Sequence, residues 1–263
     1  YFFSILLIIP YTIIVAFAGM YYYHKVLNFD KRTAFFSSMP GGVIEMVILG
    51  EQLKANTSKI TLVQSSRLLF IVLTLPFIIQ YIFHIDISGN RLITIPLKEV
   101  YLPDFFYLGI IGIIGAYTAK KLNVSAAYLI GPMVLSIIAF SSGIVHSKPP
   151  DELIKFVQVI FGTIIGFTFK GVTLNTIVNT LIGTFGHFII LALISASFIF
   201  VVYYFFDFPI ISILLAFSPG GQAEINLIAI LVAANIPYIM LHHIIRLFIV
   251  MNIAPLLAKR IKD

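Results

Sequence analysis

The chain has 263 residues, of which 60% are hydrophobic and 11% charged, whereas a soluble domain averages about 25% charged residues. Its long, recurring apolar runs indicate an all-α polytopic membrane protein with the lipid bilayer as a partner. The net charge of +6 lies mainly in short loops and therefore does not indicate a nucleic-acid partner, and the absence of cysteine excludes disulfides and thiol catalysis.

The first third of the chain predicts two spans around an interrupted segment. Residues 1–23 are long and apolar enough for one span, and residues 60–83 for another, which contains Arg67. Between them, residues 34–53 form two short apolar pieces separated by Pro40-Gly41-Gly42. Proline lacks an N–H and glycine tolerates positive φ, so this tripeptide is expected to end one helix and start another.

The rest of the chain predicts a longer series of apolar segments. Residues 84–103 are the longest polar connection, so we expect a first repeat at 1–83, a connection at 84–103 and a second repeat at 104–263. In the second repeat the predicted apolar segments are 104–119, 125–145, 154–169, 176–204, 210–234 and 238–258.

One polar pattern occurs twice, and every matched position is separated by 179 residues without a gap, which predicts an internal repeat. The matched pairs are Pro40/Pro219, Gly41/Gly220, Gly42/Gly221, Glu45/Glu224, Asn56/Asn235 and Arg67/Arg246. Tyr1 corresponds to Thr180, so residues 104–179 of the second copy have no counterpart in the first. We therefore expect the first repeat to be truncated at its N-terminus.

Each interrupted segment could either cross the membrane or enter and return on the same side. Crossing segments would make the two repeats parallel, and re-entrant segments would make them inverted. Loops 24–33 and 51–59 carry three and two Lys or Arg residues, whereas their counterparts 203–212 and 230–238 carry none. Because positive loops face the cytoplasm, this asymmetry favours two inverted repeats with re-entrant or discontinuous helices.

The restarted helices would present free N–H groups and a positive dipole end, which attract anions. Glu45 and Glu224 fall near the first turn, where each could be held by the dipole, serve as a proton or cation site, or pair with an arginine. The candidate binding residues are Gly41, Gly42, Glu45, Arg67, Gly220, Gly221, Gln222, Glu224, Asn226 and Arg246.

Arg67 and Arg246 lie within apolar spans, where a charge costs at least about 2.5–3.5 kcal/mol unless it pairs or snorkels. The structural interpretation is that both arginines snorkel to the interface and that the glutamates only pair with them. The functional interpretation is that all four line a shared polar chamber. The functional interpretation is favoured because the Pro-Gly-Gly interruption, the Glu, the Asn and the Arg all recur at one fixed spacing.

Other motifs are expected to be structural. His242 and His243 are adjacent, so on a helix they point about 100° apart, and neither a metal nor another cofactor is expected. Gly162 and Gly166 read as a helix-packing signal. Gly131-Pro132 is expected to kink a helix or, as a minor alternative, to line a pathway.

At both Pro-Gly-Gly-x-x-Glu motifs, at Arg67 and Arg246 and at Gly131-Pro132-Met133, the sequence resembles the AbrB family of bacterial membrane proteins. The resemblance implies two related halves in the bacterial inner membrane. Proteins of this family have been labelled as ammonia monooxygenases and as regulators of gene expression.

The leading hypothesis for function is a secondary transporter that binds a small polar or anionic solute, with a proton or cation as a further partner. A membrane sensor that acts indirectly on gene expression is the alternative. The six histidines are scattered and form no His-x-x-x-His pair, which argues against a metal-dependent monooxygenase, so no enzymatic activity is expected.

Overall fold

The computed structural model describes residues 1–85, 101–122, 124, 127–146, 150–167, 170–258 and 260–261. This part of the chain is helical and contains no strand. Two compact units are present: residues 1–91 join residues 167–263 in one, and residues 92–166 form the other. The predicted connection 84–103 lies mostly outside the described residues, and the predicted repeat boundaries stay a prediction.

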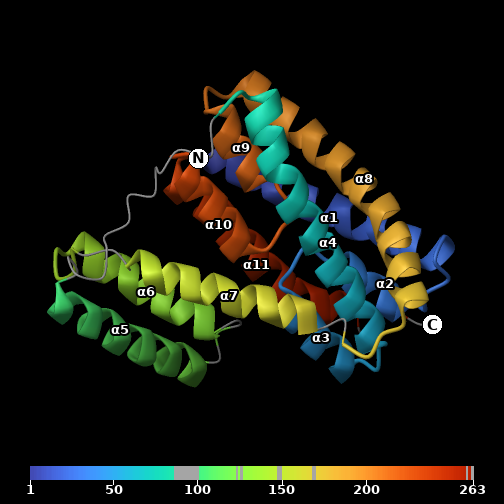
Figure 1. Cartoon of the computed structure of the whole chain (residues 1–263), viewed down its shortest axis with the longest axis horizontal. Helices are drawn as coiled ribbons and strands as arrows, with labels where there is room; N and C mark the ends of the chain where they lie inside the picture. Colours follow the sequence, from blue (N-terminus) through green and yellow to red (C-terminus); the bar gives the residue numbers. More distant parts are fainter. Residues whose placement is uncertain are drawn as a thin grey trace. The chain divides into compact units, whose positions relative to one another are not determined.

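The larger unit consists of two series of helices, labelled in Figure 1. The first series is α1 (Phe2–Lys25), α2 (Lys31–Ser38), α3 (Val43–Gln52), α4 (Thr57–Phe77) and the π-helical turn η1 (Ile78–Ile82), and the second is α8 (Leu174–Phe205), α9 (Ile210–Ala216), α10 (Gln222–Leu231) and α11 (Ile236–Ala258). α1, α4 with η1, α8 and α11 are long and apolar enough to cross a membrane. The membrane class predicted from composition is thereby supported at these four helices.

The two series match in the positions of their shorter elements. α3 begins at Val43 and α10 at Gln222, a separation of 179 residues, and the same separation holds between the starts of α2 and α9 and of α4 and α11. Asn56 caps α4 by accepting a hydrogen bond from the Lys59 amide at 3.1 Å, and Asn235 caps α11 in the same way from the Tyr238 amide at 3.1 Å. Helix capping thus accounts for the recurrence of this asparagine.

The long helices run in two opposed directions. Along α1, Tyr11 contacts Ser195 of α8 (Oη to Oγ, 3.0 Å), whereas Tyr22, further along, donates to the Gly183 carbonyl at 2.9 Å. Residues further along α1 thus contact residues that come earlier in α8, so the two helices are antiparallel. α4 packs beside α8 through Phe70 and Phe185 and runs in the same direction as α8 (Figure 1). α1 and α4 are therefore opposed to each other.

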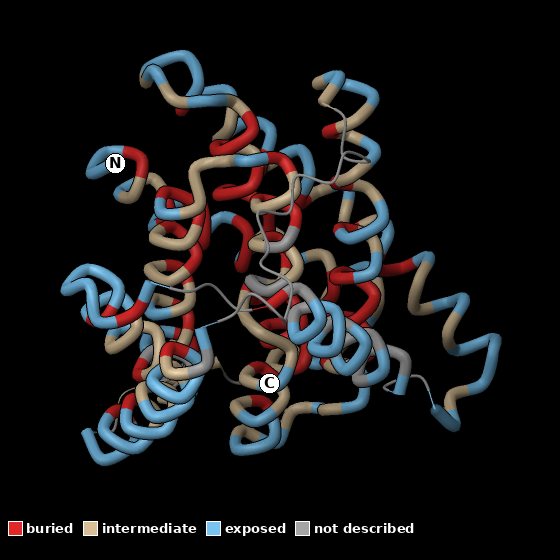
Figure 2. Tube along the Cα trace, turned by 60° about the vertical axis from the view of Figure 1, so that its left-hand side comes forward, coloured by how far each residue is buried: buried red, intermediate tan, exposed pale blue. Residues whose placement is uncertain are grey.

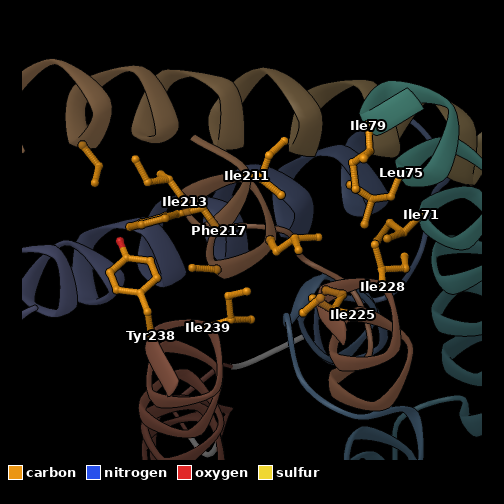
Figure 3. Packing of buried hydrophobic residues seen from close by; sticks show 14 of the residues in the cluster. Ile71, Leu75, Ile79, Ile211, Ile213, Phe217, Ile225, Ile228, Tyr238 and Ile239 are labelled. Atoms are coloured by element: carbon orange, nitrogen blue, oxygen red, sulfur yellow. The ribbon is translucent and has the colours of Figure 1, made fainter. Parts of the chain in front are cut away.

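The main core joins both series. Figure 3 shows Ile71 of α4 close to Ile225 and Ile228 of α10, with side chains of α9 and α11 beside them. Away from this core, many large apolar side chains are exposed, such as Leu193 (65% exposed) and Phe200 (67%) on α8. Figure 2 shows this division along the helices, with buried stretches in red and exposed ones in pale blue. Such surfaces are unfavourable in water and are expected where helices face lipid.

The smaller unit contains α5 (Leu102–Lys121), α6 (Ala127–Ser141) and α7 (Asp151–Phe167). α5 and α6 cross so closely that a Cβ on Gly131 would collide with the Gly115 carbonyl group. Pro132 lies inside α6, which continues to Ser141. Gly131 therefore serves close backbone approach between two helices, and the contacts of Gly162 and Gly166 lie outside what the structure describes.

Candidate functional site

The turns between α2 and α3 and between α9 and α10 hold the two Pro-Gly-Gly motifs. Gly42 caps the start of α3 at φ −69°, ψ 148°, and Gly221 caps α10 at φ −68°, ψ 143°. These are extended conformations that any residue can adopt, and among the described glycines only Gly143 and Gly171 have positive φ. Both motifs separate two helices as expected, but without positive φ at their glycines.

Close approach explains the glycines instead. A Cβ on Gly42 would collide with the Oε2 atom of Glu45, and a Cβ on Gly221 would collide with Oε2 of Glu224. Each carboxylate thus folds back over the N-terminus of its own helix. In that position the negative charge interacts favourably with the positive end of the helix dipole.

Arg67 and Arg246 each bind the backbone of the turn in their own series. Arg67 donates from Nη1 to the Met39 carbonyl at 2.9 Å and from Nη2 to the Gly41 carbonyl at 3.1 Å. Arg246 donates to the Ser218 carbonyl at 2.7 Å and to the Gly220 carbonyl at 3.4 Å. The side chains are 1% and 4% exposed, so the interpretation that they snorkel to the interface is wrong.

The arginines donate to carbonyl groups at the interruptions between the helices, and the Met39 carbonyl also accepts from Gln64 Nε2 and from the Gly41 amide. Neither Arg67 nor Arg246 forms a described hydrogen bond with Glu45 or Glu224, so a Glu–Arg pair within each series is not the arrangement found. Both carboxylates are half-buried at the turns. The acid and the base therefore remain separate groups, each next to an interrupted backbone.

A second side chain on α4 and on α11 recognises the end of the preceding short helix. Gln64 donates from Nε2 to the Phe36 carbonyl at 2.8 Å and to the Met39 carbonyl at 3.1 Å. The residue 179 positions later is His243, whose Nε2 lies 3.0 Å from the Leu215 carbonyl. His242 instead contacts Ser4 (2.7 Å), and the described residues contain no group of three His, Asp or Glu side chains placed to hold a metal.

Each turn packs against the arginine-bearing helix of the other series. A Cβ on Gly220 would lie 3.0 Å from Cγ2 of Ile71, one turn after Arg67 on α4. A Cβ on Gly41 would lie 3.3 Å from Cγ1 of Val250, one turn after Arg246 on α11. Each turn is therefore in contact with both series: its carbonyls bind the arginine of its own series, and its glycine lies against the arginine-bearing helix of the other.

Tyr11 of α1 also contacts the second interrupted segment, although nothing in the sequence indicated this role. Its hydroxyl donates to the Phe217 carbonyl at the end of α9 at 2.7 Å and lies within electrostatic range of both Arg67 and Arg246. A tyrosine inside an apolar run is indistinguishable in the sequence from one that only packs or faces lipid. Tyr23, which contacts Nδ1 of His187 at 2.8 Å, was missed for the same reason.

Buried polar atoms without a hydrogen-bond partner collect around the turns. In the first series they include Ser37 Oγ, Gln64 Oε1 and Arg67 Nε, and in the second Asn226 Oδ1 and His243 Nδ1. Buried polar groups in proteins nearly always find a partner in protein, water or ligand. The described atoms therefore provide donors and acceptors for water or a polar solute at both turns.

The structure thus places most of the predicted residues at two related turns. Gly41, Gly42 and Glu45 lie at the first turn beside Arg67, and their counterparts lie at the second beside Arg246. Gln222 is the first residue of α10, but its side chain is outside the described part of the structure. Two hollows, of about 480 Å³ and 270 Å³, are lined by other residues.

The two turns respond differently to a methyl group. In Gly42→Ala the new Cβ meets only the mobile end of Glu45, so we expect less than about 1 kcal/mol of destabilisation. In Gly221→Ala it also approaches Leu68 Cδ2 on α4 at 2.9 Å, and we expect about 1–2 kcal/mol. Thermal unfolding in detergent, followed by circular dichroism, measures the difference. Equal melting of the two variants would contradict this account.

Comparison with known proteins gives a family match over nearly the whole chain. The family model described as "Transition state regulatory protein AbrB" matches residues 1–262. The chain is also 26% identical over 274 residues to the uncharacterized protein YhjN of Bacillus subtilis (strain 168), covering 96% of this chain and 69% of that protein. No solved structure matches the chain.

Proposed function

Since the chain belongs to the AbrB family and includes four helices able to cross a membrane, we propose that it is a secondary transporter for a small polar or anionic solute. The main observation behind this proposal is that each interrupted turn packs against the arginine-bearing helix of the other series. Transporter sites are commonly built from two discontinuous helices that meet where related repeats join.

In the proposed topology the two repeats are inverted and α2–α3 and α9–α10 are re-entrant hairpins. The antiparallel contacts of α1 with α8, its counterpart, support inversion. A hydrogen bond from the Asn56 amide to Thr33 Oγ1 (2.8 Å) joins the two ends of the first hairpin. The Asn235 amide and Ser212 Oγ (3.0 Å) do the same in the second, which supports entry and return on one side.

The solute is proposed to bind between the turns. The first N–H groups of α3 and α10 have no side-chain cap, and Arg67 Nε is a buried donor without a partner, so an anionic or polar group is favoured there. Glu45 and Glu224, half-buried beside these amides, are proposed to take the coupling proton or cation. Binding at either turn would then affect the other series, because each turn also packs against the arginine-bearing helix of that series.

The bacterial inner membrane is the proposed location, with the basic loops 24–33 and 51–59 on the cytoplasmic side. The match to a Bacillus subtilis protein supports a bacterial membrane. The inverted repeats would then place the uncharged counterparts of these loops on the outer side.

Flux into proteoliposomes tests the function. We expect uptake of at least one of labelled acetate, succinate and glutamate, and a loss of at least tenfold in Glu224→Gln and Arg246→Ala. Glu51→Gln, at an exposed glutamate near the end of α3, is the matched control and should transport as wild type does. Arg246→Ala also removes hydrogen bonds to backbone carbonyls, so the isosteric Glu224→Gln is the stricter test of the proposed binding site. Wild-type flux in both variants would reject the assignment of these residues to the site.

The description of the matched family favours a second candidate, a membrane sensor that affects gene expression indirectly. The same experiment separates the two. A chain that binds a solute but gives no flux in liposomes, while its deletion changes transcription, would act as a sensor.

A further inference from the structure

A hollow of about 270 Å³ lies at one end of the larger unit, away from the two turns. It is lined by Arg32 of α2, by Gln52, Leu53 and Lys54 at the end of α3, and by Ala258 of α11. Leu53 and Ala258 are the apolar residues of this lining, and Ala258 itself is fully buried. Since one water occupies roughly 30 Å³ in the liquid, the hollow has room for a group the size of a phosphate ester.

The cations of this hollow are held in place by the backbone. Arg32 donates from Nη1 to the Leu53 carbonyl at 3.3 Å, which fixes its guanidinium against the wall. Lys54 has φ +61°, a left-handed conformation that a non-glycine residue adopts at a cost of about 1–2 kcal/mol. This conformation turns the chain sharply after α3 and places Lys54 at the rim.

The second repeat provides an internal comparison. Ala233, the counterpart of Lys54, has the same left-handed conformation at φ +50°. The backbone is thus repeated, but the charges are not: Arg32, Gln52, Leu53 and Lys54 correspond to Ile211, Leu231, Val232 and Ala233. Because the fold forms without polar residues at the second set of positions, the cations of the first set serve another purpose.

The hollow lies at the level where membrane spans begin and end. α1 ends at Lys25, α4 begins at Thr57 and α11 ends at Ala258, which itself lines the hollow. In loops 24–33 and 51–59, which the structure describes, the acids are Asp30, whose carboxylate accepts a hydrogen bond from the Thr33 amide, and the exposed Glu51. These two loops hold five Lys or Arg residues against two acids, at a level where lipid headgroups lie.

We propose that this hollow binds the phosphate group of an anionic phospholipid, with Arg32 and Lys54 on the phosphate and Leu53 against the glycerol. Guanidinium groups bind phosphate oxygens through two parallel N–H donors, and basic pockets between spans are suited to such headgroups. The proposal is independent of transport, and it places the ligand beside the end of α3, so that binding would stabilise the first hairpin.

Thermal melting of the protein in neutral detergent tests this site. Phosphatidylglycerol should raise the melting temperature of the wild type, and phosphatidylcholine should not. In Arg32→Gln/Lys54→Gln the apparent affinity for phosphatidylglycerol should fall about 30-fold, which corresponds to about 1 kcal/mol for each of two charges. The control Lys25→Gln/Lys59→Gln removes two charges at the same membrane level but outside the hollow, and it should keep the wild-type affinity.

Each outcome decides a part of the proposal. An equal loss in both double variants would show that overall charge suffices and would overturn the site, as would equal stabilisation by phosphatidylcholine. If inorganic phosphate or glycerol phosphate stabilises the wild type as strongly as the lipid does, and the hollow variant abolishes both effects, the phosphate site is supported and its ligand is a free phosphate ester.

Discussion

Replacing Arg67 with alanine is expected to lower the free energy of unfolding by about 2–4 kcal/mol. The substitution removes the donor to the Gly41 carbonyl and one of three donors to the Met39 carbonyl, and it empties the space of the largest fully buried side chain. An unsatisfied buried acceptor costs about 1–3 kcal/mol, and the relief of no longer burying a cation offsets part of the total.

The series Arg67→Ala, Arg67→Lys and wild type should melt in rising order. A lysine ammonium can reach one of the two carbonyls but lacks the planar fork that serves both, so its variant should be intermediate. Helical circular dichroism on heating in detergent provides the measurement. If Arg67→Ala melted with the wild type, the arginine would not hold the turn, and its recurrence would need a functional explanation alone.

The largest steric effect is expected for Gly131→Ala, at about 3 kcal/mol or more. The new methyl group would collide with the Gly115 carbonyl, which is backbone and cannot rotate away, and would lie 2.7 Å from Ala119 Cβ. α5 and α6 would then have to move apart, which removes much of the packing within the smaller unit.

Gly112→Ala is the matched control on α5, because a Cβ there meets nothing within 4 Å. Helix propensity predicts that this control is stabilised by up to about 1 kcal/mol relative to glycine. Limited proteolysis and circular dichroism compare the two variants. Similar behaviour of Gly131→Ala and Gly112→Ala would contradict the close crossing of α5 and α6.

Much of the fold could be predicted because its signals are local. Apolar length fixed the spans now seen as α1, α4, α8 and α11, and Pro-Gly-Gly marked the ends of α2 and α9. A proline and two glycines interrupt a helix wherever they occur, so position in the sequence is enough. The fixed 179-residue spacing likewise identified Arg67 and Arg246 as related groups before their contacts were known.

The partners of these groups could not be predicted, because they depend on how distant segments meet. The spacing of Glu45 and Arg67 allowed an ion pair, but the guanidinium binds carbonyls and the carboxylate lies over Gly42. Gly42 lies at the interruption as expected, but the feature that requires a glycine there is room for the Glu45 carboxylate and not positive φ. Tyr11 escaped notice because its carbonyl partner, Phe217, lies 206 positions further along the chain.

The contact of each turn with a helix of the other series has a consequence for biogenesis. When α1 to α4 have left the ribosome, Val250, which covers Gly41, and Ser195, which contacts Tyr11, have yet to be synthesised. After insertion, α1 to α4 therefore have a polar turn that lacks its packing partner until α8 to α11 have been synthesised. Truncation after α4 is thus expected to yield a substrate for membrane quality-control proteases rather than a stable half.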